Sequence, residues 1–190
     1  MAMATGRRMT VTVATAEDVV DFWVQAGPSR WYRKDEAFDR TFRDRFLATH
    51  EAAARGELDG WLATPVGALA LCILLDQFPR NAFRGSARMF ASDAKAREIA
   101  RAALGRKFDE QVDAELRQFF VMPFMHSEDP AEQELCVRLA KELPTDTLRY
   151  AVQHRDIIDR FGRFPHRNQV LGRPTTAEEQ RFLDEGGFSG

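Results

Sequence analysis

Between positions 64 and 75 the chain reads Thr64-Pro65-Val66-Gly67-Ala68-Leu69-Ala70-Leu71-Cys72-Ile73-Leu74-Leu75. Threonine followed by proline is typical of a helix N-cap and first helical position. The residues after them are apolar on every side, which predicts a buried central helix. The apolar run from Pro65 is far shorter than the ~20 residues that cross a bilayer, so we expect a core helix rather than a membrane span. We expect this helix to end at Phe78-Pro79, because proline disfavours helical geometry at the preceding residue.

Helix signals recur on both sides of this stretch, whereas the one strand candidate, residues 11–13, is too short to build a sheet. Caps, breakers and 3.6-residue periodicity predict further helices. We expect them from Thr15 to Gly27, from Asp35 to Gly56, from Ser92-Asp93 to about Leu104, from Val112 to Met122 with Pro123 as the stop, from Asp129-Pro130 past Leu143, from Thr145-Asp146 to Gly162, and after Thr175-Thr176.

These segments predict an all-α protein with a single domain over residues 15–185. About eight helices with short connections would stack as helix pairs, in a tetratricopeptide-like right-handed superhelix or in an irregular bundle. We expect residues 1–14 to form a flexible N-terminal segment and residues 186–190 a loose tail.

The composition indicates which cellular compartment and which classes of partner the protein is expected to have. The 190 residues hold 27 Lys and Arg against 29 Asp and Glu, a net charge of −2, which lacks the basic excess of a general nucleic-acid binder. Cys72 and Cys136 lie in apolar runs and are expected to be buried free thiols, which fits a reducing compartment. The N-terminal residues lack the apolar core of a signal peptide. We expect a soluble cytoplasmic protein with no nucleic-acid partner and no membrane contact.

The first of three segments that packing alone does not explain runs from Leu75 to Gly85. It places Asp76 in the last turn of the central helix, where the helix dipole disfavours a negative charge by ~0.3–1 kcal/mol. Something should offset that cost. We expect a partner among Arg80, Arg84 and Arg88, or an arginine of residues 155–167.

The second segment, residues 122–130, contains His126 and Glu128, which have no capping role and are candidate acid–base or metal-binding groups. The third, residues 154–168, repeats a pattern of the first. Phe78-Pro79-Arg80-Asn81 corresponds to Phe164-Pro165-His166-Arg167-Asn168, and in both cases the chain turns at Phe-Pro and an Arg-Asn pair follows. The repetition predicts that both turns face one shared pocket, with His126 or His154 at its edge.

Plainer interpretations stay open. His154 lies between Tyr150 and Ile158 in helical spacing. The same position also suits a hydrogen-bonded histidine at the edge of the core. Arg155 and Asp159 suit a surface pair worth ~0.3–0.5 kcal/mol, as do Asp39 and Arg43. Arginines of the two turns would equally cap orphan carbonyls. His126, Glu128, His154 and His166 lack a recognised metal-ligand spacing, and no nucleotide-binding or serine-nucleophile motif is present, so we predict neither metal nor cofactor.

The three segments also resemble, in this order, the marked motifs of the bacterial domain-of-unknown-function family 924. The resemblance rests on residues 75–81, Arg84-Gly85, residues 123–129, His154-Arg155-Asp156 and residues 162–168, with Val20-Asp21-Phe22-Trp23 before them. It implies an all-helical, tetratricopeptide-like fold. It implies no reaction, and no catalytic residues carry over from it.

Three functions remain in competition. A binding module would hold an anionic small molecule or peptide at a concave surface, because arginine and asparagine together fix a carboxylate. The candidate ligand-binding residues are Asp76, Arg80, Asn81, Arg84, Glu128, Arg155, His166, Arg167 and Asn168. A small-molecule enzyme would use His126 or His154 as its acid–base group, with arginines stabilising negative charge. A structural homo-oligomer would use the same residues for packing.

Overall fold

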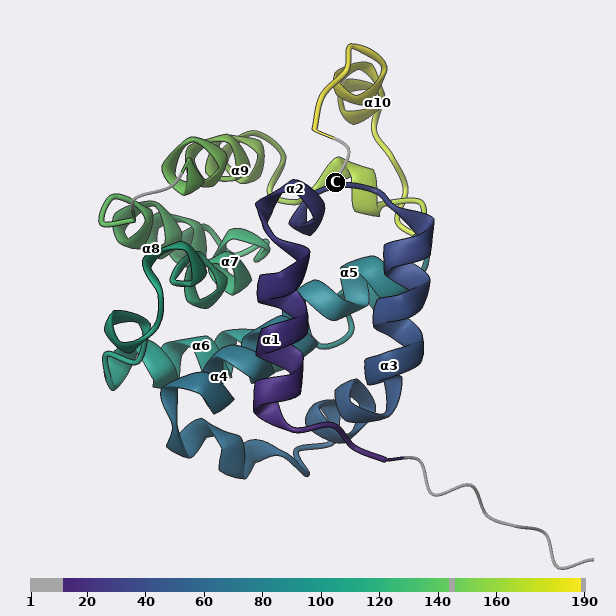
Figure 1. Cartoon of the computed structure of the whole chain (residues 1–190). Helices are drawn as coiled ribbons and strands as arrows, with labels where there is room; N and C mark the ends of the chain where they lie inside the picture. The colour runs from purple at the N-terminus through teal and green to yellow at the C-terminus, as the bar shows by residue number, and fades with distance from the viewer. Residues whose placement is uncertain (1–11, 144–145, 189–190) are drawn as a thin grey trace, which may run out of the picture.

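The computed structural model describes residues 12–143 and 146–188, and within them every regular element is helical. In chain order the α-helices are α1 (Ala16–Ala26), α2 (Pro28–Trp31), α3 (Glu36–Ala54), α4 (Pro65–Cys72), α5 (Phe78–Ala82), α6 (Asp93–Gly105), α7 (Gln118–Met125), α8 (Pro130–Ala140), α9 (Thr147–Phe161) and α10 (Ala177–Asp184) (Figure 1). The prediction of a single all-α domain is confirmed. The described parts do not include residues 1–11, 144–145 and 189–190. Most of the expected N-terminal segment, the first residue of the strand candidate and Thr145 therefore lie outside the described residues.

The core is centred on α4, as its sequence predicts. Thr64 accepts a hydrogen bond from the Gly67 N–H, Pro65 takes the first helical position, and residues 67–79 are buried without interruption. Helix α1, α6 and the short 3₁₀ helix η1 (Asp59–Ala63) pack around it. Cys72 and Cys136 are both buried and free.

The expected end of this helix at Phe78-Pro79 is wrong. The chain passes through a π-helical turn, η2 (Ile73–Gln77), and continues into α5 with Pro79 near its start. In the π-turn the Phe78 N–H bonds to the carbonyl of Ile73, five residues back, and the proline nitrogen has no hydrogen to donate. The helix therefore continues, but the carbonyls of Leu74 and Leu75 need other donors.

Three side chains supply donors to consecutive carbonyls of this turn, two of them from distant parts of the chain and one from α5. His50 Nδ1 lies 2.8 Å from the Leu74 oxygen, Ser92 Oγ donates to the Leu75 oxygen at 2.6 Å, and Arg80 donates to the Asp76 oxygen at 2.7 Å. A buried carbonyl without a donor costs about 1–3 kcal/mol. The π-turn is thus a stable feature that ties α3, α6 and α5 together.

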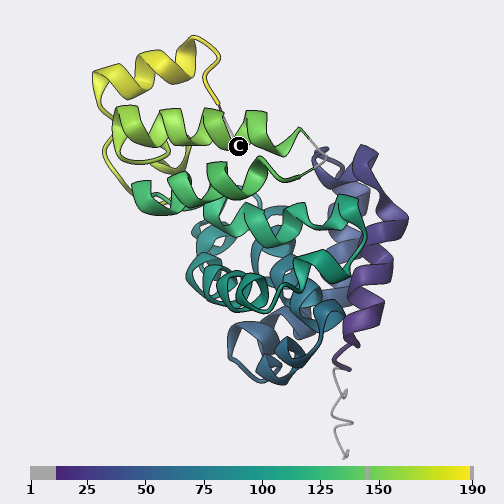
Figure 2. The ribbon, with the colours of Figure 1, turned by 90° about the vertical axis from the view of Figure 1, so that its left-hand side faces the viewer.

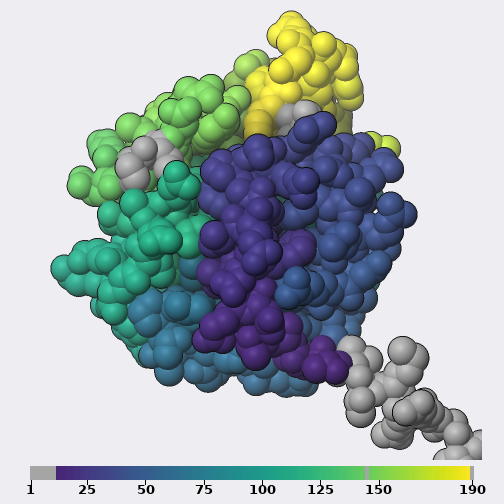
Figure 3. All heavy atoms as spheres, viewed as in Figure 1, coloured from purple at the N-terminus to yellow at the C-terminus, as the bar shows by residue number. Residues whose placement is uncertain are grey.

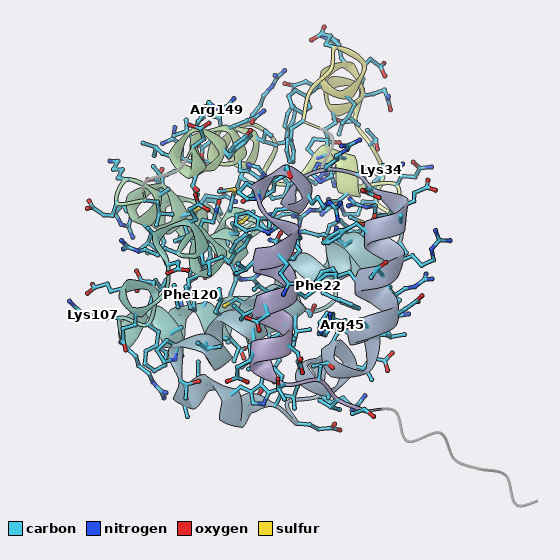
Figure 4. All side chains as sticks on the ribbon, viewed as in Figure 1. Phe22, Lys34, Arg45, Lys107, Phe120 and Arg149 are labelled. Atoms are coloured by element: carbon cyan, nitrogen blue, oxygen red, sulfur yellow. The ribbon has the colours of Figure 1, made fainter. Side chains whose placement is uncertain are left out.

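Helices α1 and α3 cover one face of the core: α1 packs on α4, and α3 packs on the π-turn η2 and on α5. Thr15 and Asp18 form a capping box at the start of α1, and Asp35 caps α3. Phe22 of α1 stacks on Phe42 of α3 at 5.2 Å, and the Arg45 guanidinium lies over the Phe22 ring. Figure 4 labels Phe22 and Arg45 between the two helices, and Figure 3 shows α1 crossing the middle of this face. The Asp39–Arg43 pair expected in α3 is replaced, because Asp39 pairs with Arg84.

The other half is a stack of consecutive helices, in which α7 packs on α8 and α8 on α9 (Figure 2). The expected stop at Pro123 is wrong: Pro123 lies inside α7, and Gln133 of α8 donates to the carbonyls of Met125 and Ser127 at the end of that helix. Residues 112–117, predicted to begin this helix, lie before α7, and two short 3₁₀ turns at Asp109–Gln111 and Ala114–Leu116 precede the helix instead. The finer expectation of a tetratricopeptide-like superhelix stays a prediction.

The C-terminal part stands apart from the main core. Helix α10 projects at one end of the molecule in both ribbon views (Figures 1 and 2). A separate apolar cluster of Ile157, Ile158 and Phe164 joins it to α9, with Phe182 and Phe188 packed against them. No helix within the described residues has the length and apolar character to cross a membrane.

Candidate functional site

The π-turn places Asp76 in the interior, where its side chain is only 1% exposed. Its carboxylate accepts from Gln77 Nε2 at 2.6 Å and lies 3.2 Å from an Arg80 nitrogen and 2.7 Å from His126 Nδ1. Burial alone would raise the pKa of Asp76, but Arg80 and His126 together lower it to about 2. The carboxylate is therefore ionised, and the expected partner Arg80 is confirmed.

His126 follows the last turn of α7. Because an ionised carboxylate only accepts hydrogen bonds, the proton between the two side chains belongs to His126 Nδ1. Burial and the nearby Arg80 lower the pKa of His126, while Asp76 opposes that shift. The imidazole is thus neutral near pH 7, and its Nε2 carries a lone pair with no hydrogen-bond partner among the residues described.

Arg80 and Arg167 meet at Asp93, the first residue of α6. Arg80 makes two bonds of 3.0 Å to the Asp93 carboxylate, whereas the nearest Arg167 nitrogen lies 3.9 Å from it. Arg167 donates to the carbonyl of His126 at 3.0 Å, and its guanidinium lies over the rings of Phe90 and Phe164 at 4.4 and 4.5 Å.

Arg167 is the less completely paired of the two arginines. Its Nε is buried and has no hydrogen-bond partner within residues 12–143 and 146–188. Burial, followed by the charge of Arg80, lowers the pKa of Arg167 to about 10, which still leaves the guanidinium charged at pH 7. A buried cation with a free donor is an unsatisfied group that an oxyanion would satisfy.

Two further histidines border this cluster. The His154 ring lies 6.2 Å from that of His126, and Phe188 contacts both His154 at 4.5 Å and His166 at 5.2 Å. Burial is the main cause that lowers the pKa of His154 and of His166 to about 3, so both are neutral. His154 Nδ1 bonds to the Tyr150 carbonyl, as the plainer interpretation predicts. No three His, Cys, Asp or Glu side chains of the described chain are arranged to hold a metal ion.

Glu128 and Asn168 belong to an adjacent network that fastens the Phe164–Asn168 turn. Glu128 accepts two bonds from Arg173 and one from the Phe164 N–H. Asn168 accepts from Arg173 and lies 3.3 Å from Glu179, which Arg163 also holds. These contacts use the polar atoms of Glu128 and Asn168 within the protein, which indicates a structural role.

The remaining sequence candidates lie away from the cluster. Asn81 and Arg84 both bind Asp39 of α3, at 2.7 and 2.6 Å. Arg155 lies on the outer side of α9, within 4 Å of Glu134, Asp156 and Asp159. Thus the arginines of the two Phe-Pro turns converge on Asp93 and His126, but their asparagines do not.

Some residues of the cluster carried no sequence signal. The sequence predicts Asp93 only as part of a helix start. It gives no indication that the Asp93 carboxylate is shared by Arg80 and Arg167. The sequence also provides no reason to place Phe90 or Gln77 in the cluster. Phe90 is an isolated aromatic residue, and Gln77 lies just before the expected end of its helix. The whole cluster is nearly closed, with the Arg80, Asp93 and Arg167 side chains 16%, 9% and 8% exposed.

The chain is similar to bacterial proteins of unknown function. A sequence model of the family described as "Bacterial protein of unknown function (DUF924)" matches residues 19–187. A solved structure, that of the protein of unknown function ATU0120 from Agrobacterium tumefaciens, is similar with a TM-score of 0.88 and 54% sequence identity, covering 90% of this chain and 97% of that one. No curated protein matches the sequence.

Proposed function

The chain belongs to the bacterial family DUF924, and we propose that it is a small-molecule enzyme in which His126 is the acid–base group and Arg167 binds a negative charge of the substrate. The observation that supports this most directly is the 2.7 Å contact between His126 Nδ1 and the buried, ionised Asp76. A carboxylate that fixes the Nδ1–H tautomer leaves Nε2 as the proton acceptor, which is the role of the buried aspartate in hydrolytic triads.

The surroundings of His126 suit proton transfer. Asp76 is held from two other sides, by Gln77 and by Arg80, so the imidazole has a fixed orientation. The lowered pKa keeps Nε2 unprotonated near neutral pH, the state that a general base needs. Positioned acid–base groups typically accelerate a reaction by about 10²–10⁴.

Arg167 supplies the complementary electrostatics. Its Nε has no partner among the described residues and its guanidinium lies over two phenylalanine rings, and the donors of a guanidinium match a carboxylate or phosphate oxygen. The two carboxylates and the two arginines of the cluster balance in charge, so the site should accept a small carboxylic acid rather than a highly charged polyanion. The same free donor favours a second candidate function, a binding module for small anionic molecules without turnover.

Acylation by diethyl pyrocarbonate, which attacks unprotonated imidazole nitrogens, tests the proposal on the intact chain. The sequence has 4 histidines, and peptide mass spectrometry gives a rate for each. We expect His126 to react faster than His50, and Asp76→Asn to slow His126 by about tenfold because the carboxylate no longer supports Nε2. Succinate should protect His126, and Arg167→Gln should abolish that protection.

Two results separate the candidates. Equal rates at His126 and His50, unchanged in Asp76→Asn, would exclude an activated imidazole and with it the enzyme. Succinate protection that persists in Asp76→Asn but disappears in Arg167→Gln, together with slow acylation of His126, would favour the binding module.

A further inference from the structure

A hollow of about 480 Å³ lies between α3, the 3₁₀ helix η3 (Ala87–Phe90) and the start of α6. Its lining residues include His50, Arg55, Phe83, Arg88, Ser92 and Lys95. None of them belongs to the His126 cluster. Ser92 and Lys95 face this hollow, while Asp93 between them binds Arg80 of the cluster. The hollow is therefore a separate feature of the same helix end.

The N-terminus of α6 opens here without a side-chain cap. Ser92 occupies the N-cap position, but its hydroxyl donates to the Leu75 carbonyl instead of accepting from the helix. The first intrahelical bond at this end runs from the Ala96 N–H to Ser92, so the N–H groups of Ala94 and Lys95 have no partner in the described structure. Free N–H groups and the positive end of the helix dipole attract an anion.

His50 provides an independent indication of a ligand. Its side chain is only 7% exposed, yet it lines the hollow. Its Nδ1 is bound to the Leu74 carbonyl and its ring stacks on Phe78 at 4.7 Å, which fixes the ring. The remaining nitrogen, Nε2, has no protein partner among the described residues. An unpaired polar atom of a buried side chain, at the wall of an open hollow, is suited to a ligand that exchanges a hydrogen bond with it.

Three cations line the hollow together with the carboxylate of Glu51, and the present partners of these cations are exchangeable. Arg55 pairs with Glu57, Arg88 with Glu51 and Lys95 with Asp59, and each of these carboxylates is about half exposed. Exposed pairs of this kind contribute only about 0–1 kcal/mol. The Arg88 guanidinium lies 3.8 Å from the centre of the Phe83 ring, which places it at the wall of the hollow. A multiply charged anion can therefore recruit these side chains at small cost.

We propose that this hollow binds the phosphate group of a small molecule. Phosphate offers several oxygens to the two free N–H groups of α6, to the arginine fork and to Lys95, and in its singly protonated form it also has a hydroxyl that can donate to His50 Nε2. A single carboxylate offers two oxygens and one charge, which leaves most of these donors without a partner. The volume of about 480 Å³ exceeds that of the ion and leaves room for the rest of an ester.

The test is a titration of the isotope-labelled full-length protein with inorganic phosphate at constant ionic strength, followed by NMR. We expect saturable shifts of the Ala94 and Lys95 amides and of the His50 ring. The double variant Arg88→Gln/Lys95→Gln should weaken binding by at least about tenfold. Arg101→Gln is the matched control, because it removes an exposed arginine of the same helix that pairs with Glu132, and it should leave the affinity unchanged. Tighter binding of glycerol 3-phosphate than of phosphate would identify an ester as the ligand, and the reverse order would identify the free ion.

Other results would overturn the proposal. One is a titration without saturation, and another is equal affinity of the double variant and the wild type. A third is a set of shifts centred on His126 and Arg167, which would assign the anion to the other cluster. His126→Gln should leave phosphate binding unchanged, so failure of the enzyme proposal and failure of this one are distinguishable.

Discussion

Asp76 and His126, fifty positions apart in the chain, share a 2.7 Å hydrogen bond in the interior of the protein. One residue lies in the π-turn of the central helix, and the other directly after α7. Their contact therefore joins the middle of the fold to the helical stack of its C-terminal half. Arg80, which also binds Asp93, extends the connection to α6. The same contacts that orient the imidazole also hold three helices in place.

Arg80→Gln should destabilise the protein by about 3–5 kcal/mol, because it leaves the buried Asp76 carboxylate without its arginine and Asp93 with only the more distant Arg167, 3.9 Å away. Arg155→Gln is the matched control. It also removes an arginine that contacts several carboxylates, but those partners are more than half exposed, and the loss should stay below about 1 kcal/mol. Urea unfolding curves of both variants measure the difference, and similar losses would show that the buried network contributes little.

The protein should lose stability as the pH falls from about 6.5 towards 5. His154 and His166 have pKa values of about 3 when folded, far below the ordinary value of about 6.5. Below pH 6.5 the unfolded chain therefore takes up protons that the folded protein excludes, which favours unfolding. Carboxylates with lowered pKa values, such as Asp76, add to this loss only at lower pH.

His154→Gln should reduce the pH dependence in that window. One histidine contributes at most about 1.4 kcal/mol per pH unit to the slope of the unfolding free energy. We expect the slope between pH 6.5 and 5 to become shallower by up to that amount, while the slopes of variant and wild type agree between pH 7 and 8. Unfolding curves at each pH provide the measurement, and identical slopes throughout would mean that folded His154 takes up protons normally.

Ser92→Ala should cost about 1–3 kcal/mol, because the buried Leu75 carbonyl loses its donor. In a Pro79→Ala background the loss should be smaller, since residue 79 then has an N–H in place to bond to the carbonyl four residues back. The double-mutant cycle isolates this coupling. If the two losses simply add, the hydroxyl of Ser92 does not replace the missing proline donor.

Leu71→Ala and Leu74→Ala should each destabilise the protein by about 2–5 kcal/mol, because both side chains are fully buried in the central helix. Val66→Ala in α4 is the control: Val66 is 37% exposed, and its truncation should cost less than about 1 kcal/mol. Thermal and chemical denaturation give the values. A loss below about 1 kcal/mol at both leucines would place the centre of the fold elsewhere.

The parts of the fold that were predictable from sequence are those set by short-range chemistry. Thr15, Asp35, Thr64, Asp129 and Thr176 all cap the helices expected of them, because a cap depends on a few neighbouring residues. The helix ends predicted at Pro79 and Pro123 were wrong, because the rule that proline ends a helix assumes that no distant group donates a hydrogen bond to the freed carbonyl. Ser92, thirteen positions beyond Pro79, does so for Leu75.

The candidate site was predictable only in part, for a related reason. The unfavourable position of Asp76 at the end of its helix predicted an arginine partner. The repeated Phe-Pro turns predicted that two arginines would take part in the site. Which of the arginines meet depends on how α6 and the Phe164–Asn168 turn pack, and periodicity does not encode that. Arg84 therefore binds Asp39 and Arg155 stays on the surface, whereas Asp93 enters the cluster.

The π-turn at Ile73–Gln77 also sets the rotational phase of the central helix. A π-turn accommodates one more residue than an α-helical turn, so the part before it and the part after it are offset by about 100° around the axis. Deleting one residue between 73 and 75 would turn this segment into regular α-helix. The rotation would then move Asp76 and Arg80 away from His126, or it would move the apolar face of α4 out of the core. Inserting one residue into a regular α-helix would produce the same offset, so relatives that are one residue shorter here are expected to lack the Asp–His pair.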